Sequence, residues 1–198
     1  MQQELDRLAQ LFLKLPGIGQ RQAKRFAYFI LTQPQSYVAS FAQALLDARS
    51  HAHTCIRCMR VYEGSAGLCP ICSDTARDQS TVLVVEKSQD IDSFGKTDYK
   101  GLFFVLGGLI PIIQKNMLAG TNIESLQKRV QTDTAIHEII LAFPITPNGE
   151  HTDVAVRELL APHKKDIKLS SLGRGLSLGA ELEYADPTSL SASLKKRE

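Results

Sequence analysis

The sequence predicts an α+β chain of several parts: an N-terminal helical region, a small cysteine-rich loop, an α/β body with a mostly parallel sheet, and a short C-terminal tail. Three observations predict this plan. Apolar residues recur at helical spacing up to about residue 50, all four cysteines fall within residues 54–75, and short β-branched runs alternate with helix-like stretches from Thr81 onward. Such alternation is typical of a doubly wound sheet. We place the boundaries at residues 1–53, 54–76, 77–172 and 173–198.

Composition and charge narrow the class of protein. The chain of 198 residues is 43% apolar and 22% charged, as globular proteins commonly are. It lacks an apolar run of the about 18 residues that a membrane span needs, and its first residues mix charges unlike a secretory signal, so we expect a cytoplasmic protein. The net charge of +2 is small, but basic residues gather before residue 54 and at Lys195–Arg197. Before residue 54, six basic residues stand against three acids: Arg7, Lys14, Arg21, Lys24, Arg25 and Arg49 against Glu4, Asp6 and Asp47.

Helical spacing in the first region is interrupted once. Helices are predicted over residues 4–14, from about Ala23 to Pro34, and over residues 36–50, with Leu15-Pro-Gly-Ile-Gly19 between the first two. The apolar face of the first helix is either a subunit contact or part of the region's own core, and it consists of Leu5, Leu8 and Phe12.

The interruption has the helix-hairpin-helix pattern. Gly17 and Gly19 allow backbone angles and close approaches that other residues exclude. Amides at the start of the second helix then offer a seat for a phosphate, and Arg21, Lys24 and Arg25 can neutralise neighbouring phosphates. Phosphate contacts carry no base information, so the pattern predicts sequence-independent, salt-sensitive DNA binding. The alternative is a plain corner between helices, in which the glycines serve only as caps.

The four cysteines form two pairs with metal-ligand spacing. Cys55 with Cys58 and Cys69 with Cys72 make two C-x2-C knuckles, which together offer the four sulfurs of a tetrahedral zinc site. Such a site has no open position for water, so the predicted ion, one Zn2+ per chain, is structural. A redox or disulfide pairing is the alternative.

Four strands and two helices are predicted in the α/β body. Short apolar, β-branched runs lie at residues 81–85, 102–106 and 138–143, with a weaker one at 166–169, and helical stretches lie at 123–130 and 152–160. Ligands of such sheets gather at the carboxyl ends of the strands.

Two acids follow strands of this body. Glu86 ends the first strand, and Glu150 follows the run at 138–143 at the start of a helix. Acids at neighbouring strand ends can hold Mg2+ for phosphoryl transfer, and the arrangement resembles the Toprim domain of topoisomerases, primases and certain nucleases. Those enzymes also carry an Asp-x-Asp pair, which Phe143–Glu150 lacks. We therefore interpret the body as a degenerate, inactive Toprim, in which Glu86 and Glu150 contact a partner or act as helix N-terminal caps.

The order of these parts resembles the RecR family of bacterial recombination mediators over the whole chain. Local segments agree: Val84–Ser88 with Asp90, Gly101–Leu106, Gly149–Glu150 with Thr152, and in the tail Gly173–Gly179, Glu181–Tyr184 and Asp186–Leu190. Two departures bear on partner contacts of the Toprim face. The family's His and the Ser of its Ser-Pro are missing around Gly107–Pro111, and Asn148 stands where the family has an acid.

The resemblance implies a non-catalytic, DNA-binding mediator of recombinational repair. It implies a homo-oligomer, a dimer or a tetrameric ring, that clamps gapped DNA or single/double-strand junctions. RecO-like and RecF-like partners would help it displace single-strand-binding protein and load the RecA recombinase. By residue match, Arg21 and Arg25 correspond to the basic residues with which the family's hairpin contacts DNA, and the four cysteines correspond to its zinc ligands. Two other functions stay open: a Mg2+-dependent Toprim nuclease acting on DNA or structured RNA, and an adaptor whose zinc loop binds only protein.

Overall fold

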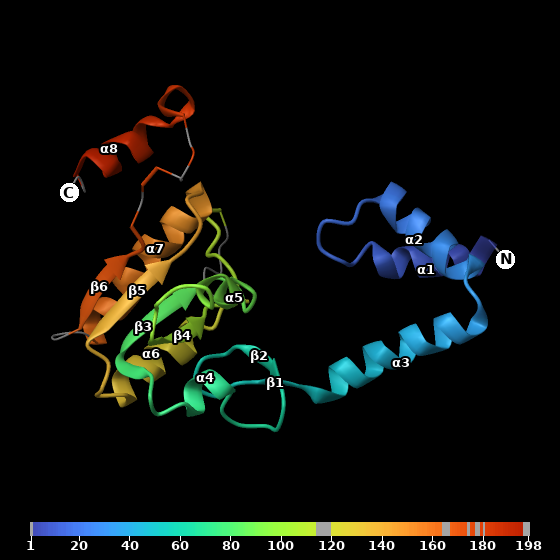
Figure 1. The fold of residues 1–198 in the computed structure, drawn as a ribbon, viewed down its shortest axis with the longest axis horizontal. Helices are drawn as coiled ribbons and strands as arrows, with labels where there is room; N and C mark the ends of the chain where they lie inside the picture. Colours follow the sequence, from blue (N-terminus) through green and yellow to red (C-terminus); the bar gives the residue numbers. More distant parts are fainter. Residues whose placement is uncertain are drawn as a thin grey trace. The chain divides into compact units, whose positions relative to one another are not determined.

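The computed structural model describes residues 2–113, 120–163, 167–173, 175–176, 179 and 181–195 (Figure 1). The chain forms two compact units, Met1–Ala52 and His53–Glu198. N-terminal helices, a cysteine cluster and a parallel sheet confirm the predicted α+β class. Some predicted positions lie outside the described residues: Asp166, Arg174, Ser177, Leu178, Lys196 and Arg197.

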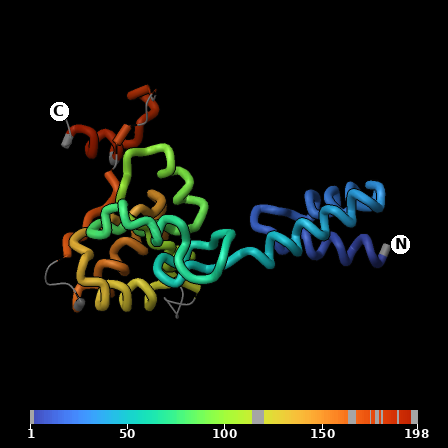
Figure 2. Tube along the Cα trace, turned by 60° about the horizontal axis from the view of Figure 1, so that its bottom comes forward, coloured from blue at the N-terminus to red at the C-terminus, as the bar shows by residue number. Residues whose placement is uncertain are grey.

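The first unit consists of three helices, α1 (Gln2–Phe12), α2 (Gln20–Thr32) and α3 (Gln35–His51), which Figure 2 traces from blue to cyan. Leu5 and Ala9 on α1 pack with Ala27 on α2 in a small core, and Leu8 and Phe12 pack against it. Of the two alternatives for the apolar face of the first helix, the structure therefore has burial in the unit's own core.

Helix α3 has a different environment. None of its residues is buried, although the helix carries several large apolar side chains. The exposed ones are Tyr37, Phe41, Leu45 and Leu46, each more than 40% accessible. An apolar helix face of this kind is normally covered in a finished assembly.

The second unit is built on a four-stranded parallel sheet. Its strands are β3 (Asp78–Val85), β4 (Gly101–Val105), β5 (Glu138–Ala142) and β6 (Lys168–Ser171), in the order β4-β3-β5-β6. Side chains alternate along β3, so that Val82 and Val84 face one layer of helices while Leu83 and Val85 face the other side. The first layer is α6 (Ile123–Thr132) and α7 (Pro147–Leu160), and the second is the short α5 (Asp90–Phe94).

Smaller elements complete the chain. Strands β1 (Ala52–Thr54) and β2 (Val61–Glu63) form a two-stranded sheet, and the short α4 (Pro70–Ser73) follows. A 3-10 turn at Ala161–His163 follows α7, and the tail contains a second 3-10 turn at Leu182–Tyr184 and the helix α8 (Pro187–Lys195). Of the helices in the described ranges, none is both long enough and apolar enough to span a bilayer.

Several observed boundaries differ from the predicted ones by a few residues, and two of these differences have a visible cause. Helix α7 begins at Pro147 instead of Thr152, because the hydroxyl of Thr146 caps it by accepting the Gly149 amide (3.1 Å) and because proline suits the first helical position. The weak strand predicted at 166–169 is observed at Lys168–Ser171, where pairing with Glu138–Leu141 of β5 sets its register.

Candidate functional site

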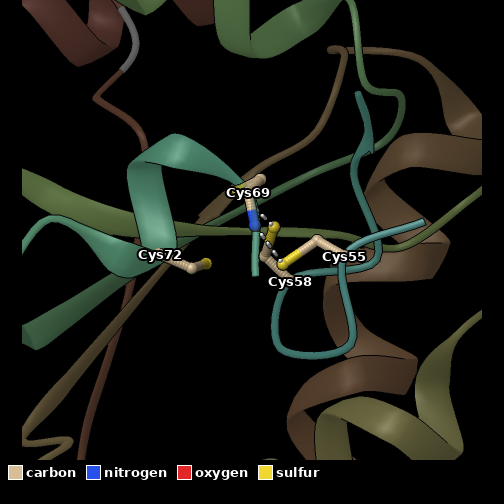
Figure 3. A group of neighbouring side chains, drawn as sticks. All are labelled: Cys55, Cys58, Cys69 and Cys72. Atoms are coloured by element: carbon tan, nitrogen blue, oxygen red, sulfur yellow. Dashed lines mark hydrogen bonds between the residues drawn. The ribbon is translucent and has the colours of Figure 1, made fainter. Parts of the chain in front are cut away.

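The four cysteines meet in one buried cluster (Figure 3). Their sulfur atoms all lie within 4.8 Å of one another, and no cysteine is more than 4% exposed. The Sγ atoms of Cys58 and Cys69 are 3.6 Å apart. A tetrahedron with Zn–S bonds of about 2.3 Å has edges of about 3.8 Å, so the cluster has the size of a zinc site. All four thiols are free, which argues against the disulfide alternative.

Backbone hydrogen bonds shape the first knuckle. The Cys55 amide donates to the Arg60 carbonyl (2.8 Å), and the Met59 amide donates to the Cys55 carbonyl (3.0 Å). Met59 has φ 60°, and it alone among the described non-glycine residues has a positive φ. The turn after the second cysteine therefore demands a left-handed residue, and a methionine occupies this place at a cost of about 1–2 kcal/mol.

The second knuckle is a helix start. Cys69 immediately precedes α4, and the amides of Cys72 and Ser73 both donate to its carbonyl at 3.0 Å. The Cys69 amide in turn donates to the sulfur of Cys55 (3.3 Å). This hydrogen bond joins the two knuckles and stabilises negative charge on a thiolate.

The closely spaced thiols differ in their pKa values. Burial raises the pKa of Cys55, but hydrogen bonds from the backbone of Cys69, Cys58 and Arg57 bring it down to about 7. Burial raises the pKa of Cys69 to about 11, and a hydrogen bond with Cys72, followed by burial, raises that of Cys58 further. The sulfurs therefore resist ionising together unless a cation balances them. Four sulfur donors at this spacing fit a structural zinc ion, with no ligand position left for a substrate.

The hairpin of the first unit has an open helix start. Gly17 lies in the left-handed region with φ 78°, and Gly19 precedes α2 without a side-chain cap. The Gly19 carbonyl accepts the first helical hydrogen bond, from Ala23 (2.9 Å). A Cβ added at either glycine would meet no atom within 4 Å. The space before the helix is therefore open, and an anion can approach its amides.

Three basic residues lie beside this opening. Arg21, Lys24 and Arg25 are three and four residues apart on α2, so they share one side of the helix, and all are exposed. None of them forms an ion pair with an acid in the described part of the chain. The structure thus brings together the five hairpin residues that the sequence singled out.

The two acids of the α/β body lie after neighbouring strands. Glu86 follows β3, is 16% exposed at its side chain and pairs with Lys87 Nζ (2.9 Å). Glu150 is exposed in the first turn of α7, whose cap is Thr146. Over the described residues, groups of three or more metal-ligating side chains occur at one place only, the four cysteines. This strand edge consequently offers few of the oxygen ligands that hold Mg2+.

Three family models match the chain in sequence order. One described as RecR, helix-hairpin-helix matches residues 5–49, one described as Toprim domain matches residues 80–171, and one described as RecR, C-terminal matches residues 175–198. The Recombination protein RecR of Lacticaseibacillus casei (strain BL23) is 37% identical over 194 residues, which cover 98% of this chain and 96% of the relative. The chain belongs to the RecR family. RecR of Limosilactobacillus reuteri (strain DSM 20016) is 38% identical over 194 residues (98% and 95% of the two chains), and RecR of Levilactobacillus brevis (strain ATCC 367) is 39% identical over 187 residues (94% and 92%).

The sequence analysis of this RecR-family chain missed a charged network beside the cysteines. Arg57 Nη2 pairs with Asp133 Oδ2 at 2.9 Å. Arg129, only 7% exposed, donates from Nη1 to the carbonyls of Phe103 (2.9 Å) and Arg57 (3.3 Å). One signal was available in the sequence: Arg129 stands three residues after Leu126 on the apolar stripe of α6, where a charged side chain is unusual.

Proposed function

We propose that this chain is a non-catalytic, cytoplasmic mediator of recombinational DNA repair that holds DNA through its hairpin. Its relatives, named Recombination protein RecR, support the biological process. The way in which the chain holds DNA is inferred from the open N-terminus of α2. Amides behind Gly17 and Gly19 seat one phosphate, and Arg21, Lys24 and Arg25 neutralise its neighbours. A phosphate grip reads no bases, so DNA of any sequence binds.

We also propose that Cys55, Cys58, Cys69 and Cys72 hold one zinc ion per chain. The ion replaces the apolar core that a loop this short cannot build. Elemental analysis of the purified protein should give about one zinc per chain, and a content near zero in protein purified without chelators would contradict the assignment.

The DNA-binding form is proposed to be a homo-oligomer, a dimer or a tetrameric ring that clamps gapped DNA or single/double-strand junctions. The uncovered apolar side of α3, with Tyr37, Phe41, Leu45 and Leu46, supports a contact between copies of the chain. RecO-like and RecF-like repair proteins would then help it load the recombinase, with Glu86 and Glu150 among the contact points. Size-exclusion chromatography with light scattering, with and without DNA, measures the oligomeric state.

The salt dependence of DNA affinity tests the hairpin. On duplex DNA, removing one phosphate-neutralising side chain reduces the slope of log affinity against log salt by about 0.9, so Arg21→Ala with Arg25→Ala should reduce it by roughly 1.8. Arg7→Ala with Arg49→Ala removes the same charge from the same unit, and this control should change the slope less. An unchanged slope in the hairpin variant would favour the adaptor that binds only protein.

Incubation with metal separates the mediator from a Toprim nuclease. Zinc-loaded protein is mixed with Mg2+ or Mn2+ and gapped DNA, nicked DNA or structured RNA, and products are followed over time. We expect no cleavage, because the strand edge after β3 and β5 offers few carboxylates. Cleavage that Glu86→Ala abolishes would establish the enzyme instead.

A further inference from the structure

Two arginines, Arg60 after the first knuckle and Arg129 on α6, carry buried nitrogens without partners. In the described part of the chain, three buried side-chain nitrogens have no hydrogen-bond partner: Nε of Arg60, and Nε and Nη2 of Arg129. Arg60 belongs to the first knuckle, since its carbonyl accepts the Cys55 amide. Buried donors are nearly always satisfied in folded proteins, so the two on Arg129 require an explanation.

The surroundings of Arg129 compensate its charge only in part. Its side chain is 6% exposed, and Nη1 alone of its nitrogens donates a hydrogen bond. The acid beside it is Asp133, whose Oδ2 lies 4.0 Å from Arg129 Nε but 2.9 Å from Arg57 Nη2. One carboxylate thus faces two guanidinium groups. A buried cation without a counter-charge is strongly unfavourable.

The cysteine cluster is a second source of negative charge near Arg129. A zinc ion with four thiolates carries two net negative charges. The carbonyl that holds Arg129 belongs to Arg57, which lies between Cys55 and Cys58. The Cys58 carbonyl accepts the Val105 amide of β4 at 2.8 Å, and Arg129 also donates to β4, at Phe103.

The guanidinium therefore lies where the first knuckle meets the edge strand. Burial lowers the pKa of Arg129, and negative charge on Cys72, Asp133 and Cys58 acts against that shift.

We infer that Arg129 is the counter-charge of the zinc–thiolate cluster and couples metal loading to the packing of α6 against β4. The inference rests on the proposed zinc site. It makes Arg129 a positioning residue with no part in DNA contact. When zinc is absent, the buried cation loses this counter-charge, and the sheet domain loosens together with the loop.

Zinc retention and stability of the full chain, measured together, test this role. Removing a group that supports the ligands of a metal site typically weakens metal affinity 10–100-fold, so Arg129→Met should raise the zinc dissociation constant by roughly that factor in competition with a chromogenic chelator. In metal-free protein the thiolate cluster no longer balances this charge, so the same substitution should lower the melting temperature less than it does in zinc-loaded protein. The stabilisation by zinc should therefore shrink. A purely structural arginine would lower both melting temperatures equally.

Lys128→Met provides the matched control. Lys128 is exposed on the same helix, carries the same charge and lines the same groove of about 470 Å³ as Arg129. The Lys128→Met protein should bind zinc with the dissociation constant of the wild type. If Arg129→Met does not fold, Arg129→Lys and Arg129→Gln make the comparison, with the lysine variant expected to retain zinc better.

Two results would overturn the inference: wild-type zinc affinity in Arg129→Met, or equal zinc retention in the lysine and glutamine variants. A wild-type protein without zinc would instead refute the proposed metal site itself, so the two failures are distinguishable.

Discussion

Replacing Gly149 by alanine should destabilise the second unit by about 2 kcal/mol. A Cβ at this position would lie 1.9 Å from the Pro144 carbonyl oxygen, whereas real Cβ contacts are essentially never below 3.0 Å. That oxygen also accepts the Thr146 amide at 2.9 Å, so it cannot move by the required 1.1 Å without breaking the turn. Overpacking against backbone costs about 3 kcal/mol at the upper end of its usual range, and the helix preference of alanine recovers about 1 kcal/mol.

Thermal unfolding followed by circular dichroism measures this destabilisation. For a domain of this size, about 2 kcal/mol corresponds to a decrease of about 4–8 °C in melting temperature. Gly108→Ala is the control in the same unit, because its Cβ would lie 3.8 Å from the Gly120 carbonyl, an ordinary contact. A Gly149→Ala protein that melts with the wild type would refute the tight turn between β5 and α7, and with it the placement of Glu150.

Three further substitutions have defined outcomes. Gly17→Ala should lower the free energy of unfolding of the first unit in urea by about 1 kcal/mol, because φ is 78° there; an unchanged midpoint would contradict that conformation. Thr152→Val should cost about 1–3 kcal/mol in the same assay, because its buried hydroxyl accepts a backbone amide at 2.8 Å, whereas Thr152→Ser should keep most of the stability; equal losses would argue against the hydrogen bond. The pKa of Glu138 is lowered by the Ser170 hydroxyl and then by a neighbouring lysine, so its stabilisation is complete above its unfolded-state value of 4.5 and is lost as the pH falls below that value. Glu138→Gln should therefore make stability less dependent on pH in that acidic range, and parallel acid-unfolding curves would exclude the effect.

Much of the site could be predicted from the sequence because its signals are local. Two C-x2-C spacings specify a four-sulfur cage wherever the loop lies, and the knuckle turns that point the sulfurs inward span only a few residues each. The hairpin is likewise a local signal, because Gly17 and Gly19 lie just before the helix that carries Arg21 and Arg25. The strand runs were also recognisable, because a buried parallel strand is apolar on both faces.

Other features depended on segments far apart in the chain. The start of α7 was misplaced, because a Thr–Pro pair that caps a helix can equally form a turn until the neighbouring strand fixes its direction.

By itself, the sequence determined the cluster of four cysteines, the glycine hairpin between the first two helices and the strands of the sheet, since each depends on spacing within one short segment. Only the tertiary structure decided that Arg129 lies buried against a knuckle more than 70 residues earlier in the chain, and that α3 buries none of its apolar side chains. The physical reason is that burial and charge compensation arise between distant segments, once the sheet has set their register.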